Sequence, residues 1–385
     1  MRALHDPAAR PGLEALSADG PKAAVAAAAD GAAPSLAARA GRVLLALAGG
    51  TAGGWAAHRL QLPLAWMIGA MTATTAAATL GLPIAMPPLL RSVMVAVLGV
   101  MLGSGFSPAI LERMAEWALS LALLAAYSAA AGTAALLYFR RLCGYDAVTA
   151  YFAAMPGGLS EMILVGTEMG GDARIISLSH ASRLLLVVLA LPFAFQALTG
   201  YEPGARPPAG PPLAGVPLQD LAILAACGVA GFLGARALKV PAAAVVGPMI
   251  LSAAVHLADW TAAKPPVELV AAAQVVVGAA IGCRFAGVEF GLLRRAVVAA
   301  LGATAILLGA TIGFALALHA AVGLPVQPLV LAYAPGGLAE MSLIALAIGA
   351  DAAFVATHHI VRIFLIVVFA PAAFRLLRRG PAAGP

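Results

Sequence analysis

The sequence contains an internal duplication, and this feature most restricts how the chain can fold. The segment Met155–Met162 reads Met-Pro-Gly-Gly-Leu-Ser-Glu-Met, and Ala334–Met341 repeats it as Ala-Pro-Gly-Gly-Leu-Ala-Glu-Met. Polar residues and prolines further along coincide in the same register: Asp172 with Asp351, His180 with His359, Arg183 with Arg362, and Pro192 with Pro371. Matches of this kind are rarely due to chance in an apolar sequence. The chain therefore consists of two copies of one unit.

The balance of apolar and charged residues identifies the surroundings of these units. Apolar residues make up 62% of the chain and charged residues only 10%, whereas a soluble domain carries roughly 25% charged residues. Several apolar runs approach the roughly 20 residues needed to cross a bilayer. In lipid only helices and closed barrels satisfy the backbone. Because the runs are long and do not alternate, we predict an all-α polytopic membrane protein.

The repeat and the apolar segments define the expected organisation. We predict a disordered N-terminal tail over residues 1–41, a first membrane repeat over 42–198, a linker over 199–217, a second membrane repeat over 218–377, and a short C-terminal tail over 378–385. The linker is expected because proline and glycine are concentrated there.

The distribution of Lys and Arg indicates how the two repeats are oriented. If each Pro-Gly-Gly segment dips into the membrane and returns, each unit has five spans and the units are inverted. In this arrangement only Arg59, Arg113, Arg206 and Lys264 fall outside. A parallel arrangement would divide the basic residues almost evenly, contrary to the positive-inside rule. We therefore predict ten spans, two re-entrant or broken segments, and both termini in the cytoplasm.

The duplicated segments Pro156-Gly157-Gly158 and Pro335-Gly336-Gly337 are predicted to break helices inside the membrane. Proline removes a backbone donor and glycine tolerates conformations that other residues resist. The helix that restarts after each break directs its positive end at it. Transporters with inverted repeats build their central binding sites from such paired broken helices. A kink that serves only packing is the alternative.

Two glutamates and two arginines follow the breaks. Glu161 and Glu340 are candidates for an ion or proton pathway, because carboxylates are costly at this depth; reaching headgroup water is the alternative. Arg183 and Arg362 lie near the middle of the last span of each unit. Pairing of Glu161 with Arg183 and of Glu340 with Arg362 is the simplest expectation, and such pairs could be purely structural.

His180 and His359 precede these arginines by three residues, which places them on nearly the same helix face. A histidine near a carboxylate and a cavity can relay protons, whereas a buried histidine can also be merely hydrogen-bonded. Asp172 and Asp351 precede the last span of each unit, and we predict that they are helix N-caps.

The sequence offers no enzyme signature. It contains no metal-binding or nucleotide-binding motif and no convincing nucleophile triad, so we expect no cofactor and no metal. The net charge of +6 is attributed to cytoplasmic loops, so no nucleic-acid partner is expected. The expected partners are the lipid bilayer and a small-molecule or ion substrate, and a homo-oligomer is compatible with the sequence.

With its paired Pro-Gly-Gly-Leu-x-Glu-Met segments, the sequence resembles the bacterial AbrB-type membrane protein family over about residues 42–377. The resemblance implies a duplicated membrane unit in the inner membrane of a bacterium. Members are often labelled regulators of gene expression or ammonia monooxygenases, and they share only a name with the soluble DNA-binding sporulation regulator. The expected fold is also similar to five-plus-five inverted-repeat transporters with crossed broken helices, such as bile-acid symporters and sodium/proton antiporters, an analogy that implies no substrate.

The leading expectation is a secondary transporter or exporter of a small anionic or zwitterionic solute, coupled to protons or sodium. Its site would comprise the two breaks and Glu161, His180, Arg183, Glu340, His359 and Arg362. A non-transporting membrane sensor that affects gene expression indirectly is the second hypothesis. A membrane monooxygenase is the third, and the lack of a ligand set for a metal or flavin disfavours it.

Overall fold

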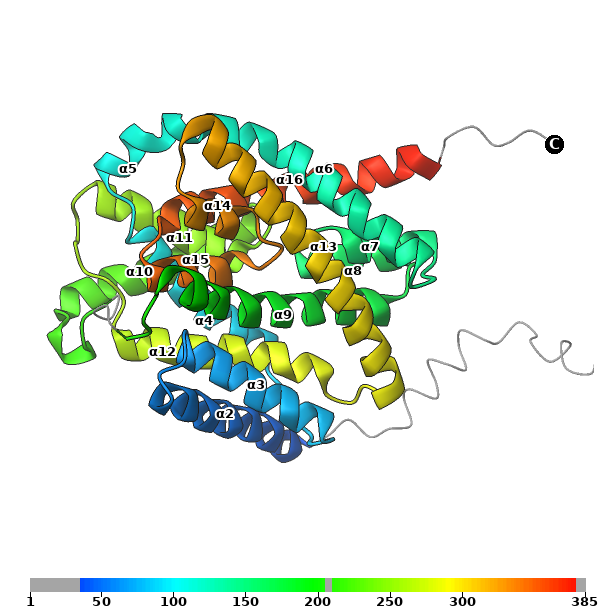
Figure 1. Cartoon of the computed structure of the whole chain (residues 1–385). Helices are drawn as coiled ribbons and strands as arrows, with labels where there is room; N and C mark the ends of the chain where they lie inside the picture. Colours follow the sequence, from blue (N-terminus) through cyan, green and yellow to red (C-terminus); the bar gives the residue numbers. More distant parts are fainter. Residues whose placement is uncertain (1–34, 205–209, 379–385) are drawn as a thin grey trace, which may run out of the picture. The chain divides into compact units, whose positions relative to one another are not determined.

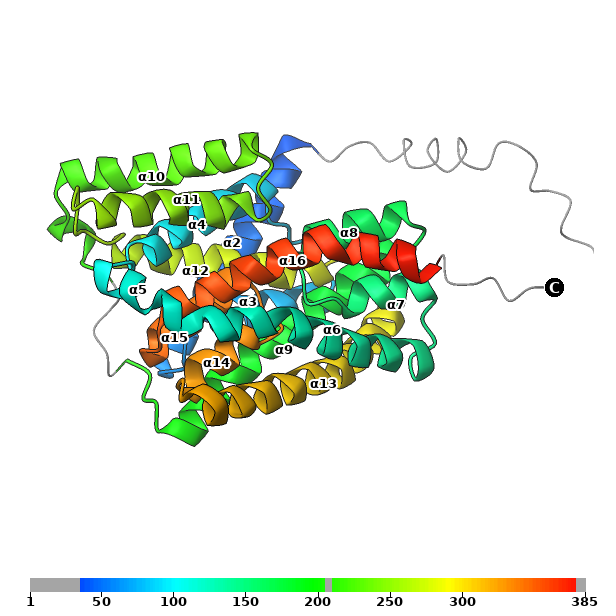
Figure 2. The same cartoon turned by 90° about the horizontal axis from the view of Figure 1, so that it is seen from above.

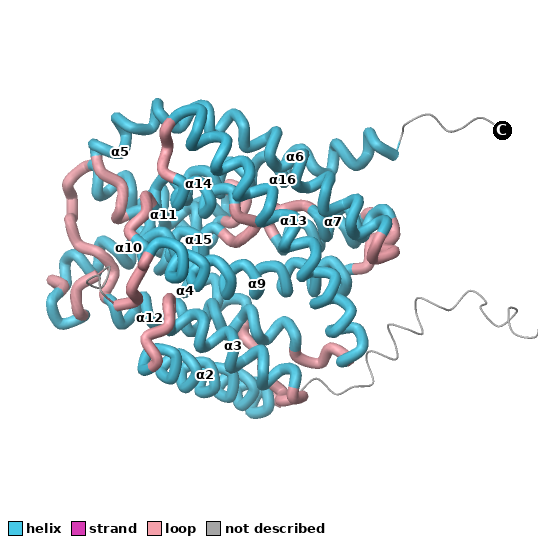
Figure 3. Tube along the Cα trace, viewed as in Figure 1, coloured by secondary structure: helices cyan, strands magenta, loops and turns pink. Residues whose placement is uncertain are grey.

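The computed structural model of the protein describes residues 35–204 and 210–378. The predicted N-terminal tail up to residue 34, linker residues 205–209 with Arg206, and the tail from residue 379 lie outside the described residues. The described residues are helical, and no strand occurs among them (Figure 3). Residues from Arg42 onward form one compact unit, and the packing described below is that of this unit.

The helices of the two halves follow one another in the same order (Figure 1). The first half contains α2 (Leu36–Arg59), α3 (Ala65–Thr79), α4 (Pro88–Gly103), α5 (Pro108–Arg113), η1 (Met114–Trp117), α6 (Ala118–Arg141), α7 (Ala147–Ala154), α8 (Leu159–Glu168) and α9 (Ala173–Thr199). The second half contains η2 (Leu213–Gly215), α10 (Leu218–Ala237), α11 (Ala243–Leu257), α12 (Val267–Gly282), η3 (Cys283–Phe285), α13 (Phe290–Val322), α14 (Val326–Tyr333), α15 (Leu338–Ile348) and α16 (Ala352–Arg378). Corresponding helices agree in length, with 15 residues in α3 and α11, 16 in α4 and α12, 8 in α7 and α14, and 27 in α9 and α16.

Six stretches of the described chain are long and apolar enough to cross a membrane. They are Met114–Arg141, Ala173–Thr199, Leu218–Ala237, Val267–Phe285, Phe290–Val322 and Ala352–Leu376. Helices α4, α11 and α15 are apolar but shorter. The protein is therefore an all-helical, multi-pass membrane protein.

Glycines allow helices from the two halves to pack closely. Gly99 on α4 faces the carbonyl of Val245 on α11, and Gly278 on α12 faces the carbonyl of Met67 on α3. Glycines one turn further along α4 and α12 repeat this close approach. A side chain at these positions would meet the neighbouring backbone, which is why small residues line such crossings in membranes. The same contact thus occurs twice, with the roles of the two halves exchanged.

The last helices of the two halves run in opposite directions. In Figures 1 and 2, α16 runs toward the C-terminal end of the chain at the right, whereas α9 runs toward the linker. Ile176 near the start of α9 accordingly belongs to the same apolar cluster as Phe374 near the end of α16.

Each Pro-Gly-Gly segment forms the tip of a helical hairpin. The backbone N–H of Asp172, just after α8, donates to the Thr149 hydroxyl in the first turn of α7 at 2.8 Å. The start of α14 and the end of α15 likewise line one surface pocket. The start of α7 therefore lies near the end of α8, and the start of α14 lies near the end of α15.

Aspartates begin the helices that follow both hairpins, which confirms their prediction as N-caps. The Asp172 carboxylate accepts hydrogen bonds from the backbone N–H groups of Arg174 at 2.8 Å and Ile175 at 3.1 Å. The Asp351 carboxylate accepts one from Phe354 at 3.0 Å. These bonds satisfy donors that the first turn of a helix leaves free.

Candidate functional site

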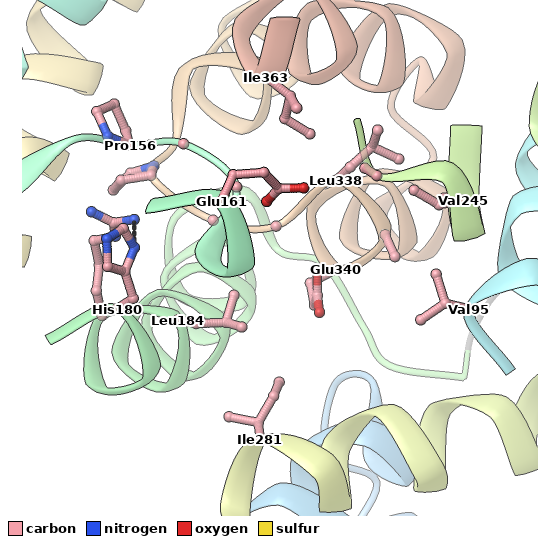
Figure 4. A pocket seen from close by; sticks show the side chains of 18 of the residues that line it. Val95, Pro156, Glu161, His180, Leu184, Val245, Ile281, Leu338, Glu340 and Ile363 are labelled. Carbon is pink, nitrogen blue, oxygen red and sulfur yellow. Dashed lines mark hydrogen bonds between the residues drawn. The ribbon is translucent and has the colours of Figure 1, made fainter. Parts of the chain in front are cut away.

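The two hairpin tips meet at one cavity of about 200 Å³. All of the predicted site residues line it except His359, which lies behind Arg362 and bonds to it. Glu161 and Glu340 enter the cavity from α8 and α15, with His180 at one edge (Figure 4). Residues far apart in sequence, in both halves of the chain, thus share one site.

Proline explains why each hairpin needs a histidine behind it. In a helix the carbonyl of Phe152 would accept from the N–H of residue 156, but Pro156 has none. Nε2 of His180 lies 2.8 Å from this carbonyl oxygen and supplies the missing donor. In the second half, Pro335 frees the carbonyl of Leu331, and Nε2 of His359 lies 2.9 Å from it.

The arginines complete this pairing. Nη2 of Arg183 donates to Nδ1 of His180 at 2.9 Å, and Nη2 of Arg362 donates to Nδ1 of His359 at 2.9 Å. A carbonyl only accepts and a guanidinium only donates, so each imidazole is neutral with its proton on Nε2. Neither ring nitrogen is left free for a relayed proton, which argues against the predicted proton relay through these histidines.

The arginines also hold the unwound backbone. Arg183 donates to the carbonyl of Met155 at 3.2 Å. Arg362 donates to the carbonyls of Tyr333 at 3.2 Å, Ala334 at 2.6 Å and Gly336 at 2.9 Å. Backbone groups freed inside a membrane must find such partners, so the arginines fix the shape of both breaks.

The predicted ion pairs of Glu161 with Arg183 and of Glu340 with Arg362 are wrong. The ion pairs among the described residues join Arg113 to Glu116 and to Asp351. Each glutamate instead lies in the first turn of its helix and folds back over the glycine that begins it. A carboxylate is favourable there because it faces the positive helix end, while the guanidinium groups bind carbonyl oxygens.

Gly158 and Gly337 are required by these carboxylates and not by the backbone. Their φ angles are −57° and −85°, which any residue adopts. A Cβ on either glycine would collide with the carboxylate oxygen of Glu161 or Glu340. The glycines therefore make room for the carboxylates beside the cavity.

A Gly337→Ala substitution should consequently change function more than stability. The group displaced is the end of a flexible side chain, so we expect the melting temperature of purified protein to stay within a few degrees of wild type. Solute transport should fall strongly because the Glu340 carboxylate moves. Gly309→Ala on α13, where a Cβ meets nothing within 4 Å, is the control and should leave both unchanged; equal transport by the two variants would contradict this role of the glycine.

Two further arginines line the cavity that were not among the predicted site residues. Arg91 lies in the first turn of α4 and Arg284 in η3. Arg284 interacts electrostatically with Arg91 and with Glu340. The count of basic residues assigned both to the cytoplasmic side, at the ends of the apolar segments 90–106 and 267–285. The repeat was the signal available in the sequence, because Arg91 falls on Val270 and Arg284 on Gly105. Each half therefore carries one arginine where the other half has an uncharged residue.

Comparison with known proteins identifies the family to which the chain belongs. Residues 66–378 match the family model described as "Transition state regulatory protein AbrB". The chain is 28% identical over 301 residues to "Uncharacterized protein YhjN" of Bacillus subtilis (strain 168), covering 73% of this chain and 77% of that protein. It is 24% identical over 326 residues to "Putative regulator AbrB" of Escherichia coli (strain K12), covering 83% of this chain and 91% of that protein. The chain, with its duplicated helical unit and paired hairpins, therefore belongs to the AbrB family.

Proposed function

We propose that this protein is a secondary transporter of a small anionic or zwitterionic solute, driven by a proton or sodium gradient, and not an enzyme. The observation that carries the proposal is the convergence of both Pro-Gly-Gly segments on one cavity. Paired broken helices at matching positions of two repeats are the usual way in which transporters build a site between two gates. The cavity of about 200 Å³ suits a solute smaller than a drug-sized ligand.

Charge supports an anionic group on the solute. Arg91, Arg183, Arg284 and Arg362 line the cavity together with only two carboxylates. Among the described residues neither Arg183 nor Arg362 has a carboxylate partner, and the Nε atom of each is buried without a hydrogen bond there. Two helix N-termini also point at the cavity, and such ends favour anions.

We infer further that the halves are inverted, with ten spans in all. The antiparallel course of α9 and α16 and the exchanged contacts of α4 with α11 and of α12 with α3 support this inference. The start of α9, the region of η3 and the start of α13 share an apolar cluster, and the end of α6 adjoins them. Basic residues are concentrated at these ends, so this side is assigned to the cytoplasm.

The proposal is tested by reconstitution in liposomes. Transport currents on a solid-supported membrane would be recorded for amino acids, mono- and dicarboxylates, phosphate and sulfate, each with a pH gradient, a sodium gradient or neither. We expect a current for at least one anionic or zwitterionic solute that a gradient increases. No current above that of protein-free liposomes for any solute would refute the proposal.

The name of the E. coli relative supports a second candidate, in which the chain senses the solute and affects gene expression indirectly. A variant that binds the solute but does not transport it distinguishes the sensor from the transporter. A sensor keeps its effect on transcription in that variant, whereas an effect that follows from transport disappears.

A further inference from the structure

The internal repeat relates the mouth of the central cavity to a second opening in the protein. The mouth is lined by Arg91 and Val95 of α4, Ala242 and Ala244 at the start of α11, and Arg284 in η3. The other opening is lined by Leu64, Trp66, Val270 and Gln274, from the starts of α3 and α12. In the repeat register Val95 falls on Gln274, and Ala244 falls on Trp66 after a shift of one residue. We call the first the basic mouth and the second the matched opening.

The two openings lie at opposite ends of the same helices. The basic mouth uses the start of α4 and the end of α12, whereas the matched opening uses the start of α12 and, through Met101, the end of α4. The basic mouth reaches both Pro-Gly-Gly segments. The matched opening stops at Leu343 and Leu346 on α15, one to two turns beyond Glu340.

The openings also differ in charge. Arg91 and Arg284 line the basic mouth, and their repeat counterparts are Val270 and Gly105. Among the described residues that line the matched opening, none is charged. The central cavity is lined by four arginines and two carboxylates, and such an excess of one sign of charge attracts counter-ions, so the basic mouth should attract an anion.

We propose that Arg91 and Arg284 form an anion-collecting mouth through which the protein loads an anionic solute from the cytoplasmic side. The proposal rests on the transport function proposed above and narrows it, because it assigns the solute an anionic group that meets these two guanidinium groups. Arg284 and Glu340 line the same cavity, so an anion held at Arg284 lies in the cavity that also holds the second hairpin tip.

The electrostatics and the sidedness of the mouth can be measured without knowing the solute. In protein with Cys143, Cys227 and Cys283 replaced by serine, Val95→Cys and Gln274→Cys place one thiol at each opening. Reaction rates would be measured with an anionic methanethiosulfonate (sulfonatoethyl) and a cationic one (trimethylammonioethyl). Both reagents would be added to inside-out and to right-side-out vesicles. The matched background carries Arg91→Gln and Arg284→Gln.

We expect the reaction rate of the anionic reagent, divided by that of the cationic reagent, to be at least about tenfold higher at position 95 than at position 274. The preference should disappear in the Arg91→Gln/Arg284→Gln background and be unchanged at position 274. Position 95 should react from the cytoplasmic side. Equal preferences at both positions, a preference that survives loss of the arginines, or reaction of position 95 from the outer side would each overturn the proposal. Because no solute is involved, these outcomes are independent of the liposome currents.

Discussion

An Arg362→Met variant is expected to be the least stable single-site variant of the cavity. Arg362 is 1% exposed and donates to three backbone carbonyls and to His359. Methionine fills similar space but cannot donate to these four acceptors, of which the Tyr333 carbonyl keeps a bond from the Thr311 hydroxyl at 3.4 Å. Each buried acceptor that loses its donor costs about 1–3 kcal/mol, because it keeps its desolvation penalty. The second hairpin should lose its fixed shape, and transport should be lost with it.

The first half of the chain provides the matched control. Arg183 occupies the equivalent position but donates to one carbonyl and one histidine, so Arg183→Met should lower the melting temperature by about half as much. Arg362→Lys keeps the charge but lacks the planar fork that reaches several carbonyls, and it should fall between wild type and Arg362→Met. The measurement is the amount of monodisperse protein left after heating in detergent. A larger loss for Arg183→Met than for Arg362→Met would contradict the assignment of these bonds.

The sequence alone predicts the frame of this site well. The duplication, the breaks at both Pro-Gly-Gly segments, and the caps at Asp172 and Asp351 follow from local rules about proline, glycine and first-turn aspartate. Local rules also show that Pro156 strands the carbonyl of Phe152. They do not show which side chain donates a hydrogen bond to this carbonyl, because His180 reaches it only when the hairpin packs against α9.

Side-chain direction explains what the sequence could not predict. Glu161 and Arg183 have opposite charges at similar depth, so a pair was the simplest expectation. In the fold the glutamate turns toward its own helix end, and the guanidinium turns toward carbonyls that the break releases. The roles of Arg91 and Arg284 depend on the packing of α4 beside α12, which no local pattern encodes.

A Glu161→Gln/Glu340→Gln variant is expected to lose gradient-driven accumulation while it still exchanges solute. Glutamine keeps the size of each side chain and its acceptor oxygen, so the hairpin tips and the melting temperature should be preserved. The substitutions remove both negative charges among the residues that line the cavity. The anion keeps its arginines, whereas the coupling proton or sodium ion loses the carboxylates that carboxylate-based coupling requires. Accumulation should therefore fall to the level of protein-free liposomes.

Two assays on the same liposomes separate these steps. Counterflow with labelled solute on one side and unlabelled solute on the other needs binding and alternation but no driving ion, and it should persist in the double variant. Glu168→Gln removes an exposed carboxylate at the far end of α8 and should leave both assays at wild-type level. Wild-type accumulation by the double variant would exclude the glutamates from coupling. Loss of counterflow along with accumulation would instead place the carboxylates in contact with the solute, and its recognised group would then be cationic and not anionic.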